Sequence, residues 1–248
     1  MTNPLILKLD RSGLLTDADR ATLSALCAPM RHVAADQDIV REGESGENVH
    51  LVLDGIACRY KILPEGRRQI IGLLLPGDFC DLQSAVLGEM DHSIATLTPC
   101  ALVDIPQHVV DALTLDHSRI ARALWWATLV DESVLREWLV NMGQRPADRR
   151  TAHLLCELLL RLQAVGRAEG DACDLPLTQT ELGDILGLTN VHINRVLQDL
   201  RGRGLVALKE RRLEIPDLAA LQAFCGFDPA YLRLRRRVID GRRAGSAG

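Results

Sequence analysis

The stretch "TQTELGDILGLTNVHINRVLQDLRGRGLV", residues 178–206, decides the fold. Thr178 is followed three residues later by Glu181, a capping box that starts a helix. Gly187 stands where a left-handed residue ends such a helix, and Thr189 can cap a second helix after a very short turn. Two short helices joined by a glycine-bearing turn predict a helix-turn-helix.

The second helix of this motif has two different faces. One is an apolar stripe with the spacing i, i+3, i+4, i+7, formed by Ile193, Val196, Leu197 and Leu200. The other face carries Asn190, Val191, His192, Asn194, Arg195 and Gln198. Because the second helix of a helix-turn-helix enters the major groove, we expect this second face to touch DNA.

The segment "LVALKERRLEI" follows directly and predicts two short strands, 205–208 and 213–215, around the charged turn "KERR". Such a hairpin behind a helix-turn-helix is typical of the wing of a winged helix. Lys209, Arg211 and Arg212 lie at its tip, where their charges suit contact with phosphates.

A long helix precedes the motif. Residues 109–142 contain neither glycine nor proline, and their apolar residues recur at helical spacing, with a break expected near 115–118. A helix of this length is too long for its own small domain to cover, so we expect the same helix of a second subunit to cover the spare face. The hinge "GQRP" follows, then a helix over 147–165 and a polar loop over 166–174.

The first part of the chain has a different texture. A short helix is expected over 16–26, and residues 33–105 then form short apolar runs punctuated by glycine. "ACRYKIL" and "RQIIGLLL" predict two strands joined at "PEGR". This pattern predicts an antiparallel β-roll, so the fold class is α+β: roll, long helix and winged helix-turn-helix.

Charge divides the chain in the same way. Residues 1–144 hold 12 Lys and Arg against 20 Asp and Glu, whereas residues 145–248 hold 17 against 13. We place a sensor-type roll at 1–107, the long helix and hinge at 108–144, the DNA-binding domain at 145–226 and a basic tail at 227–248. The arginines of that tail are Arg233, Arg235, Arg236, Arg237, Arg242 and Arg243.

Several protein classes are excluded by what the sequence lacks. No apolar run approaches the roughly 20 residues of a membrane helix, and no secretory signal opens the chain, so we expect a cytoplasmic protein without membrane contact. The seven cysteines are scattered without a C-x-x-C pair, so neither a zinc ribbon nor a clustered iron–sulfur site is expected. No metal or cofactor is assigned, and haem ligation through Cys58, Cys80, His50 or His92 stays open without a spacing that supports it. No phosphate loop, catalytic triad order or HExxH spacing indicates an enzyme.

Taken together, "REGESGENVHLVLDG" with "PGDF", the long helix and the helix-turn-helix resemble the cyclic AMP receptor protein/FNR (Crp/Fnr) family of bacterial transcription regulators. The resemblance covers nearly the whole chain. It implies a homodimer, paired through the long helix, on a two-fold-symmetric site in double-stranded DNA with half-sites ~34 Å apart. RNA polymerase is then an expected partner.

The resemblance also assigns roles to residues. Arg195 falls on the guanine-reading arginine of the family, and Asn190, Val191 and Asn194 fall on other base-reading positions. The positions that touch phosphates in the family are Thr178, Gln179, Thr189 and His192. Val191 departs from well-known members, which place there a glutamate that accepts from cytosine. Valine can instead meet a thymine methyl group, so a different half-site is expected.

The resemblance suggests a cyclic nucleotide in the roll, but the residues argue against it. The family's ribose-binding glutamate is replaced by Leu82 and the arginine of its phosphate-binding Arg-Ser pair by His92, while the serine of that pair is kept as Ser93. These three remain the candidate effector positions. An iron–sulfur sensor needs a cysteine cluster, and only Cys27 lies in the first fifty residues. A redox-active thiol at Cys156 or Cys173 and constitutive activity stay open.

A second function class fits the same order of domains. The chain would then be a ligand-binding signalling module whose C-terminal domain contacts protein rather than DNA. Binding of duplex DNA distinguishes the two hypotheses.

Overall fold

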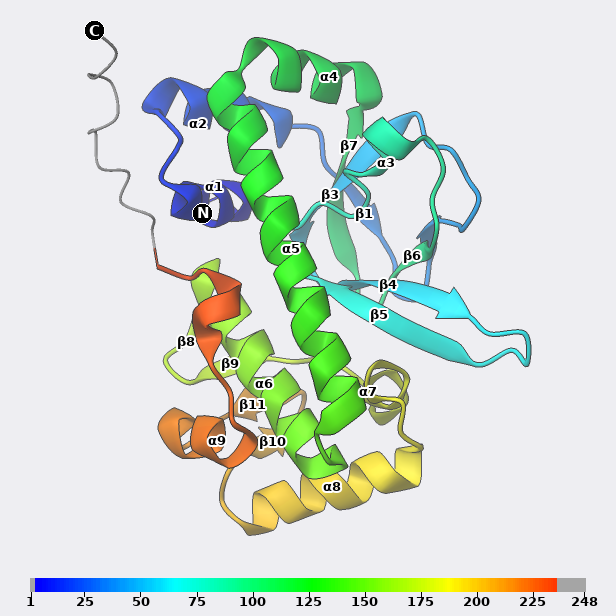
Figure 1. Cartoon of the computed structure of the whole chain (residues 1–248), viewed down its shortest axis with the longest axis vertical. Coiled ribbons are helices and arrows are strands. Elements are labelled where there is room, and N and C mark those ends of the chain that lie inside the picture. The colour runs from blue at the N-terminus through cyan, green and yellow to red at the C-terminus, as the bar shows by residue number, and fades with distance from the viewer. Residues whose placement is uncertain (1–2, 236–248) are drawn as a thin grey trace, which may run out of the picture.

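The computed structural model describes residues 3–235 of the chain (Figure 1). A β-roll, a long helix and a C-terminal domain follow one another, which confirms the predicted α+β class. Helix α5 runs down the length of the molecule, past the roll and on to the C-terminal domain. No helix among the described residues is both long and apolar enough to cross a membrane.

The roll consists of two antiparallel sheets with the strand orders β1-β7-β3 and β2-β6-β4-β5. Its strands are β1 (Arg31–Val33), β2 (Asp38–Val40), β3 (Asn48–Asp54), β4 (Ala57–Ile62), β5 (Arg68–Leu74), β6 (Ser93–Thr96) and β7 (Cys100–Pro106). The predicted hairpin is β4 paired with β5. Strand β5 lies at the edge of its sheet, so one side of its backbone has no strand partner there.

Short helices pack against the roll. These are α1 (Pro4–Leu9), α2 (Asp17–Leu26) and α3 (Ser84–Leu87). Helix α1, which the sequence analysis did not predict, packs against the turn at Gly77. A Cβ at Gly77 would lie 2.7 Å from the carbonyl oxygen of Pro4, and its φ is +92°, so only glycine fits there.

The long helical region is divided as expected. Helix α4 (Gln107–Asp116) ends at His117, and α5 (Ser118–Gln144) continues to the hinge. One face of α5 is buried against the roll and the N-terminal helices, through Ile120, Ala123 and Ala127. Its other face leaves large apolar side chains in solvent.

The C-terminal domain begins with α6 (Ala147–Ala164) and contains α7 (Gln179–Leu186), α8 (Asn190–Gly202) and α9 (Leu218–Cys225). Its strands, which include β10 (Ala207–Lys209), form one sheet of order β10-β11-β9-β8. The polar loop predicted over 166–174 is wrong, because β8 (Ala168–Glu169) and β9 (Ala172–Asp174) form a hairpin there. Strand β9 pairs with β11 (Arg212–Glu214), so this short hairpin depends on a partner distant in the sequence.

The segment that we predicted to be a basic tail begins in the core. The short helix η2 (Pro229–Leu232) packs beside α5 and α6, and Phe227 and Leu232 are buried. Tyr231 donates a hydrogen bond to Glu157 of α6 at 2.8 Å. Of the tail arginines, Arg233 and Arg235 lie on the surface, and the others lie outside the described residues.

One apolar cluster joins the roll to the C-terminal domain. It includes Ile70 and Leu73 of β5, residues of α6 such as Leu158, and Ile185 of α7. The two parts of the chain are therefore packed against each other rather than linked only through the hinge.

Candidate nucleic-acid interface

The helix-turn-helix is built as its sequence predicts. Thr178 Oγ1 accepts from the backbone N–H of Glu181 at 3.2 Å, and Glu181 Oε2 accepts from the N–H of Thr178, which completes the capping box. Gly187 ends α7 in the left-handed region with φ of +62°. Thr189 Oγ1 accepts from the N–H of His192 at 3.3 Å and so caps α8.

The angle between α7 and α8 depends on a close approach at Gly183. The N–H of Leu188 donates to the carbonyl oxygen of Gly183 at 3.0 Å. A Cβ at Gly183 would lie 2.6 Å from the carbonyl oxygen of Leu188, which is backbone and cannot move aside cheaply. The missing side chain therefore lets the turn fold tightly against α7.

The polar face of α8 is open to solvent. Asn190, Val191, His192 and Arg195 are exposed, with 73% of Val191 accessible, and Asn194 is half-buried. The opposite stripe, including Ile193 and Leu200, is buried, as predicted.

Two amides of this face are held by α7. Asn190 Nδ2 donates to Thr180 Oγ1 at 3.1 Å, and Asn194 Nδ2 donates to Gln179 Oε1 at 3.3 Å. Sequence reasoning did not single out Thr180, because its role appears only when two segments ten residues apart meet. Within residues 3–235 Arg195 makes no ion pair or hydrogen bond, so its guanidinium is available to a ligand.

The positions expected to touch phosphates lie around the same surface. Thr178 and Thr189 are exposed at the N-termini of α7 and α8, and Gln179 is exposed in the first turn of α7. Helix N-termini present unpaired N–H groups and a partial positive charge, which suits anions.

The wing is present with shifted boundaries. Its strands are β10 (Ala207–Lys209) and β11 (Arg212–Glu214), and Lys209 pairs directly with Arg212. The turn is Glu210-Arg211, with φ of +50° and +66°, so Arg211 stands alone at the tip among the basic residues. Arg212 instead contacts Glu169 at 3.0 Å and Asp174 at 3.3 Å, which partly neutralises its charge.

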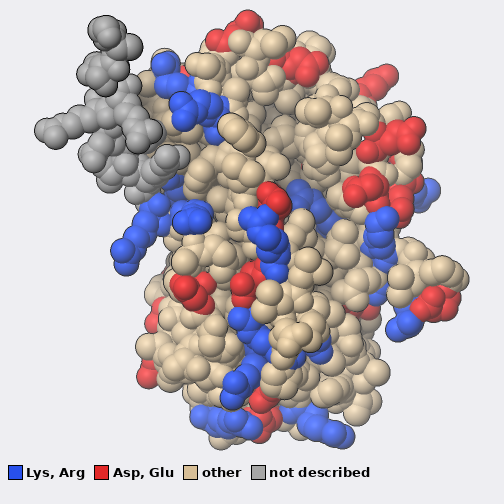
Figure 2. Space-filling model, in the orientation of Figure 1, with Lys and Arg blue, Asp and Glu red and all other residues tan. Residues whose placement is uncertain are grey.

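The surface follows the charge division of the sequence. In Figure 2, Lys and Arg side chains gather along the lower edge of the molecule, over the region of α8 in Figure 1. Acidic side chains gather at the top and upper right, over the roll and α4. The basic end is the one that carries the exposed face of α8.

The three candidate effector positions lie in different surroundings. Leu82 is half-buried beside α3. His92 is buried with its Nδ1 2.6 Å from Asp91, and burial lowers the pKa of the imidazole despite that carboxylate. Ser93 Oγ accepts from the N–H of Glu42 at 3.0 Å. None of the three lines the cavity described next.

The open end of the roll, where it meets α5 and α6, is filled by the chain itself. Arg59 Nε donates to the carbonyl oxygen of Cys80 at 3.0 Å, and its Nη2 to that of Phe79 at 2.9 Å. One cavity at this junction leaves about 20 Å³ for the centre of a water molecule. That space suits about one water and no nucleotide. It is lined by residues that include Arg59, Gly72, Leu73, Asp131, Trp138 and Arg161.

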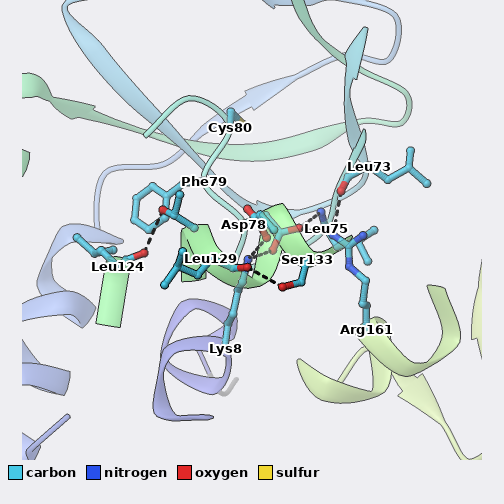
Figure 3. A network of polar contacts seen from close by, with 12 residues as sticks. Lys8, Leu73, Leu75, Asp78, Phe79, Cys80, Leu124, Leu129, Ser133 and Arg161 are labelled. Carbon is cyan, nitrogen blue, oxygen red and sulfur yellow. Dashed lines mark hydrogen bonds and ion pairs between the residues drawn. The ribbon is translucent and has the colours of Figure 1, made fainter. Parts of the chain in front are cut away.

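Charged side chains gather beside this cavity, and Figure 3 shows Lys8, Asp78 and Arg161 lying close together. Lys8 Nζ lies 2.6 Å from Asp78 and 3.3 Å from Asp131, while Arg161 lies 2.9 Å from Asp78 and 3.1 Å from Glu157. Burial alone would lower the pKa of Arg161, but these carboxylates overcome it and raise that pKa. We call Lys8, Asp78, Asp131, Glu157 and Arg161 the junction network.

The cysteines proposed as redox-active are buried. Burial raises the pKa of Cys173 to about 11, and a hydrogen bond with Cys225, followed by burial, raises the pKa of Cys156. Both are therefore protonated thiols at neutral pH, the less reactive form.

A β-roll, a long helix with an apolar open face and a winged helix-turn-helix define a DNA-binding regulator. The Crp-like helix-turn-helix domain family matches residues 149–224, and the cyclic nucleotide-binding domain family matches residues 30–117. The transcriptional activator protein FnrL of Cereibacter sphaeroides is 30% identical over 203 residues, which cover 80% of this chain and 81% of FnrL.

Two further relatives agree. The nitrogen fixation regulation protein FixK of Bradyrhizobium diazoefficiens is 28% identical over 195 residues, covering 77% of this chain and 80% of FixK. The solved structure of FixK2 from Bradyrhizobium japonicum superposes with a TM-score of 0.71 at 26% identity, covering 79% of this chain and 96% of that one. The chain belongs to the Crp/Fnr family of transcription regulators. The predicted family is thereby confirmed, as is the prediction that the protein is not an enzyme.

Proposed function

We propose that the protein is a homodimer that binds a two-fold-symmetric site in double-stranded DNA and regulates transcription without control by cyclic AMP. The observation that carries this proposal is the exposed face of α8. Its arginine is unpaired within the described residues and its two asparagine side chains are oriented by α7.

The free face of α5 supports a dimer. Its exposed large side chains are Trp125, Leu129, Leu135, Leu139, Val140 and Met142, and 65% of Trp125 and 74% of Leu139 are accessible. A row of large apolar side chains in water is unfavourable, and such patches mark protein interfaces. The same helix of a second copy would bury this row and relate the two α8 helices by a two-fold axis.

The reading face suggests the chemistry of a half-site. The guanidinium of Arg195 can pair with O6 and N7 of a guanine, and Asn190 and Asn194 can reach neighbouring base edges. Val191 has no acceptor, and its exposed methyl groups suit the methyl of a thymine. Thr178, Gln179, Thr189 and His192, with Lys209 and Arg211 of the wing, would hold the phosphates. Arg212 would contribute less, because Glu169 and Asp174 already hold it.

The side chains of the roll argue against binding of a cyclic nucleotide. An anionic cyclic phosphate is bound strongly where a cation donates to it, and Leu82 and His92 supply no permanent charge at the family's positions. The guanidinium of Arg59 is committed to two backbone carbonyls.

The proposal includes RNA polymerase as a partner of the protein and the cytoplasm as its location. The relative FnrL is a transcriptional activator protein, and a regulator of that kind acts beside the polymerase on chromosomal DNA.

The test is selection of bound duplexes from a random pool, followed by affinity measurements with Arg195→Ala. We expect a loss of about 1–3 kcal/mol in binding and relaxed preference at one base pair of each half-site. Arg201→Ala, which removes the same charge near the end of α8, should leave the base preference unchanged. Lack of duplex binding by the unaltered protein would instead favour a signalling module that contacts protein.

A further inference from the structure

Edge strand β5 makes the most buried polar contacts between the roll and the DNA-binding domain, and a more exposed ion pair joins Arg167 to Asp54 of β3 at 3.0 Å. The sheet partner of β5 is β4 on one side only. Helix α7 packs directly against β5, and α6 approaches its far end. The strand thus contacts the domain at two separated points.

The inner contact is at the C-terminal end of β5. Arg161 Nη2 of α6 donates to the carbonyl oxygen of Leu73 at 2.9 Å and pairs with Asp78 in the turn that follows the strand (Figure 3). Its Nη1 is held by Glu157 at 3.1 Å. Since only 14% of the Arg161 side chain is exposed, this contact is well shielded from solvent and salt.

The outer contact is at the N-terminal end of β5. Arg68 Nε lies 2.8 Å from Asp184 of α7, and both side chains are about three-quarters buried. Gln69 Nε2 donates to the carbonyl oxygen of Ile185 at 3.3 Å. Two attachment points on one strand restrain rotation of the domain as well as its translation.

Apolar packing fills the space between the two contacts. Ile70 and Leu73 belong to the same buried cluster as Leu158 of α6 and Ile185 of α7. Packed interiors resist continuous deformation, so the cluster adds stiffness to the polar contacts.

The exposed face of α8 is left untouched by this packing. Asn190, Val191 and Arg195 stay exposed although α7 is held against β5. The domain can therefore present its reading face in the orientation that β5 imposes.

We propose that β5 acts as a fixed dock that sets the angle of α8 in each subunit, and thereby the half-site spacing that the dimer accepts. The inference rests on the proposed homodimer and its two-fold site. Arg68 and Arg161 are positioning residues in this scheme, because they act on DNA only through the orientation of α8.

Spacing is a sensitive readout of that orientation. Inserting one base pair between half-sites moves one of them by about 3.4 Å and turns it by about 35°. A rigid dimer should therefore lose affinity steeply for each insertion or deletion, whereas a dimer with loosely held reading helices should lose less.

The chain offers a matched pair of neighbouring arginines for the test. Arg68 bridges to Asp184 of the DNA-binding domain, whereas Arg67 is exposed and, among residues 3–235, forms an ion pair only with Glu65 of its own hairpin. Affinity of the full-length protein would be measured for the selected site and for the same half-sites one base pair closer and further apart, with Arg68→Gln and Arg67→Gln.

We expect Arg68→Gln to reduce the discrimination between spacings by about threefold or more, with the base preference within each half-site unchanged. Arg67→Gln should behave as the unaltered protein does. Asp184→Asn should reproduce the effect from the other side of the contact, and the swap Arg68→Asp with Asp184→Arg should restore part of the spacing preference. Thermal melting of each variant separates loss of fold from loss of orientation.

The outcomes separate the two proposals. If the unaltered protein binds no duplex, the proposed function fails and the dock is not at issue. If it binds with a sharp spacing preference that Arg68→Gln and Asp184→Asn both leave intact, the dock is refuted. Tighter binding by Arg68→Gln would also refute it, because β5 would then hold the domain away from DNA.

Discussion

The roll interior and the exposed face of α8 both carry arginine and polar side chains, but their partners differ. In the roll, Arg59 donates to two backbone carbonyls, and His50 is held by Asp81 at 2.6 Å. On α8, Arg195 has no partner within the described residues and lies in solvent.

The difference separates structural from ligand-binding polar groups. A buried polar group must be paired within the protein, because leaving it unpaired costs about 1–3 kcal/mol. A group that is to bind a ligand must keep its donors available. By this criterion the Arg59 side of the roll is occupied by the chain itself and the face of α8 is open. The following predictions test that contrast from the largest effect to the smallest.

Removing Arg161 should have the largest effect. Arg161→Met would leave Glu157 buried without its cation and Asp78 with Lys8 alone, and breaking a buried pair in this way costs about 3–5 kcal/mol of unfolding free energy. Urea denaturation measures the loss. Arg67→Met is the control, because its pair with Glu65 is exposed and worth under about 1 kcal/mol. Equal losses for the two variants would show that the junction network is not a structural element.

The second-largest effect is expected at Gly183, where the close approach of the turn fixes how α8 lies against α7. The added methyl of Gly183→Ala would collide with the carbonyl of Leu188, so we expect a loss of about 1–3 kcal/mol in stability and weaker DNA binding. Gly202→Ala is the matched control, since nothing lies within 4 Å of a Cβ there. That control should be neutral or stabilising by up to about 1 kcal/mol. Normal DNA binding by Gly183→Ala would contradict the tight turn.

A pH effect should come from His153 of α6. Burial, then Arg145, lowers the pKa of this imidazole from 6.5 to about 4. The folded state therefore binds fewer protons than the unfolded one. The contribution of the neutral His153 side chain to the free energy of unfolding is intact above pH 6.5. It is lost as the pH falls toward 4, and the loss is about 2 kcal/mol at pH 5.

Urea unfolding at pH 7 and pH 5 checks this sign. His153→Gln should remove about 2 kcal/mol of the pH-dependent loss, whatever its effect on stability at neutral pH. His108→Gln, at an exposed position, should leave the loss unchanged. An identical pH dependence in His153→Gln and the unaltered protein would place the acid sensitivity elsewhere.

The smallest expected effect is that of cyclic AMP. A ligand at 100 times its dissociation constant stabilises a protein by about 2.7 kcal/mol, which thermal melting detects easily. We expect no shift with about 1 mM cyclic AMP, and no difference from AMP as the control. A clear upward shift of the melting temperature with cyclic AMP, but not with AMP, would show that the roll binds the cyclic nucleotide.

The helix-turn-helix could be predicted because its signals are local. Thr178, Glu181, Gly187 and Thr189 act within one or two turns of helix, and the structure places each in the predicted role. The break near His117 was likewise predicted from the helical pattern.

The features that could not be predicted from the sequence depend on contacts between residues that are distant along the chain. Hairpin β8–β9 looks like a polar loop because its strands are very short and β9 gains a partner only in β11. The neutralisation of Arg212 by Glu169 and Asp174 follows from that same pairing. The role of Thr180 and the contact of Arg68 with Asp184 arise only once the helices and domains pack.

The shared apolar cluster also bears on how this protein can be engineered. A chimaera that joins its DNA-binding domain to the roll of a relative would strip Ile70 and Leu73 from the face they cover on α6 and α7. Separating the two parts would expose a packed apolar interface rather than a flexible linker. Transplantation of the domain should therefore succeed only when β5 and the turn after it travel with it.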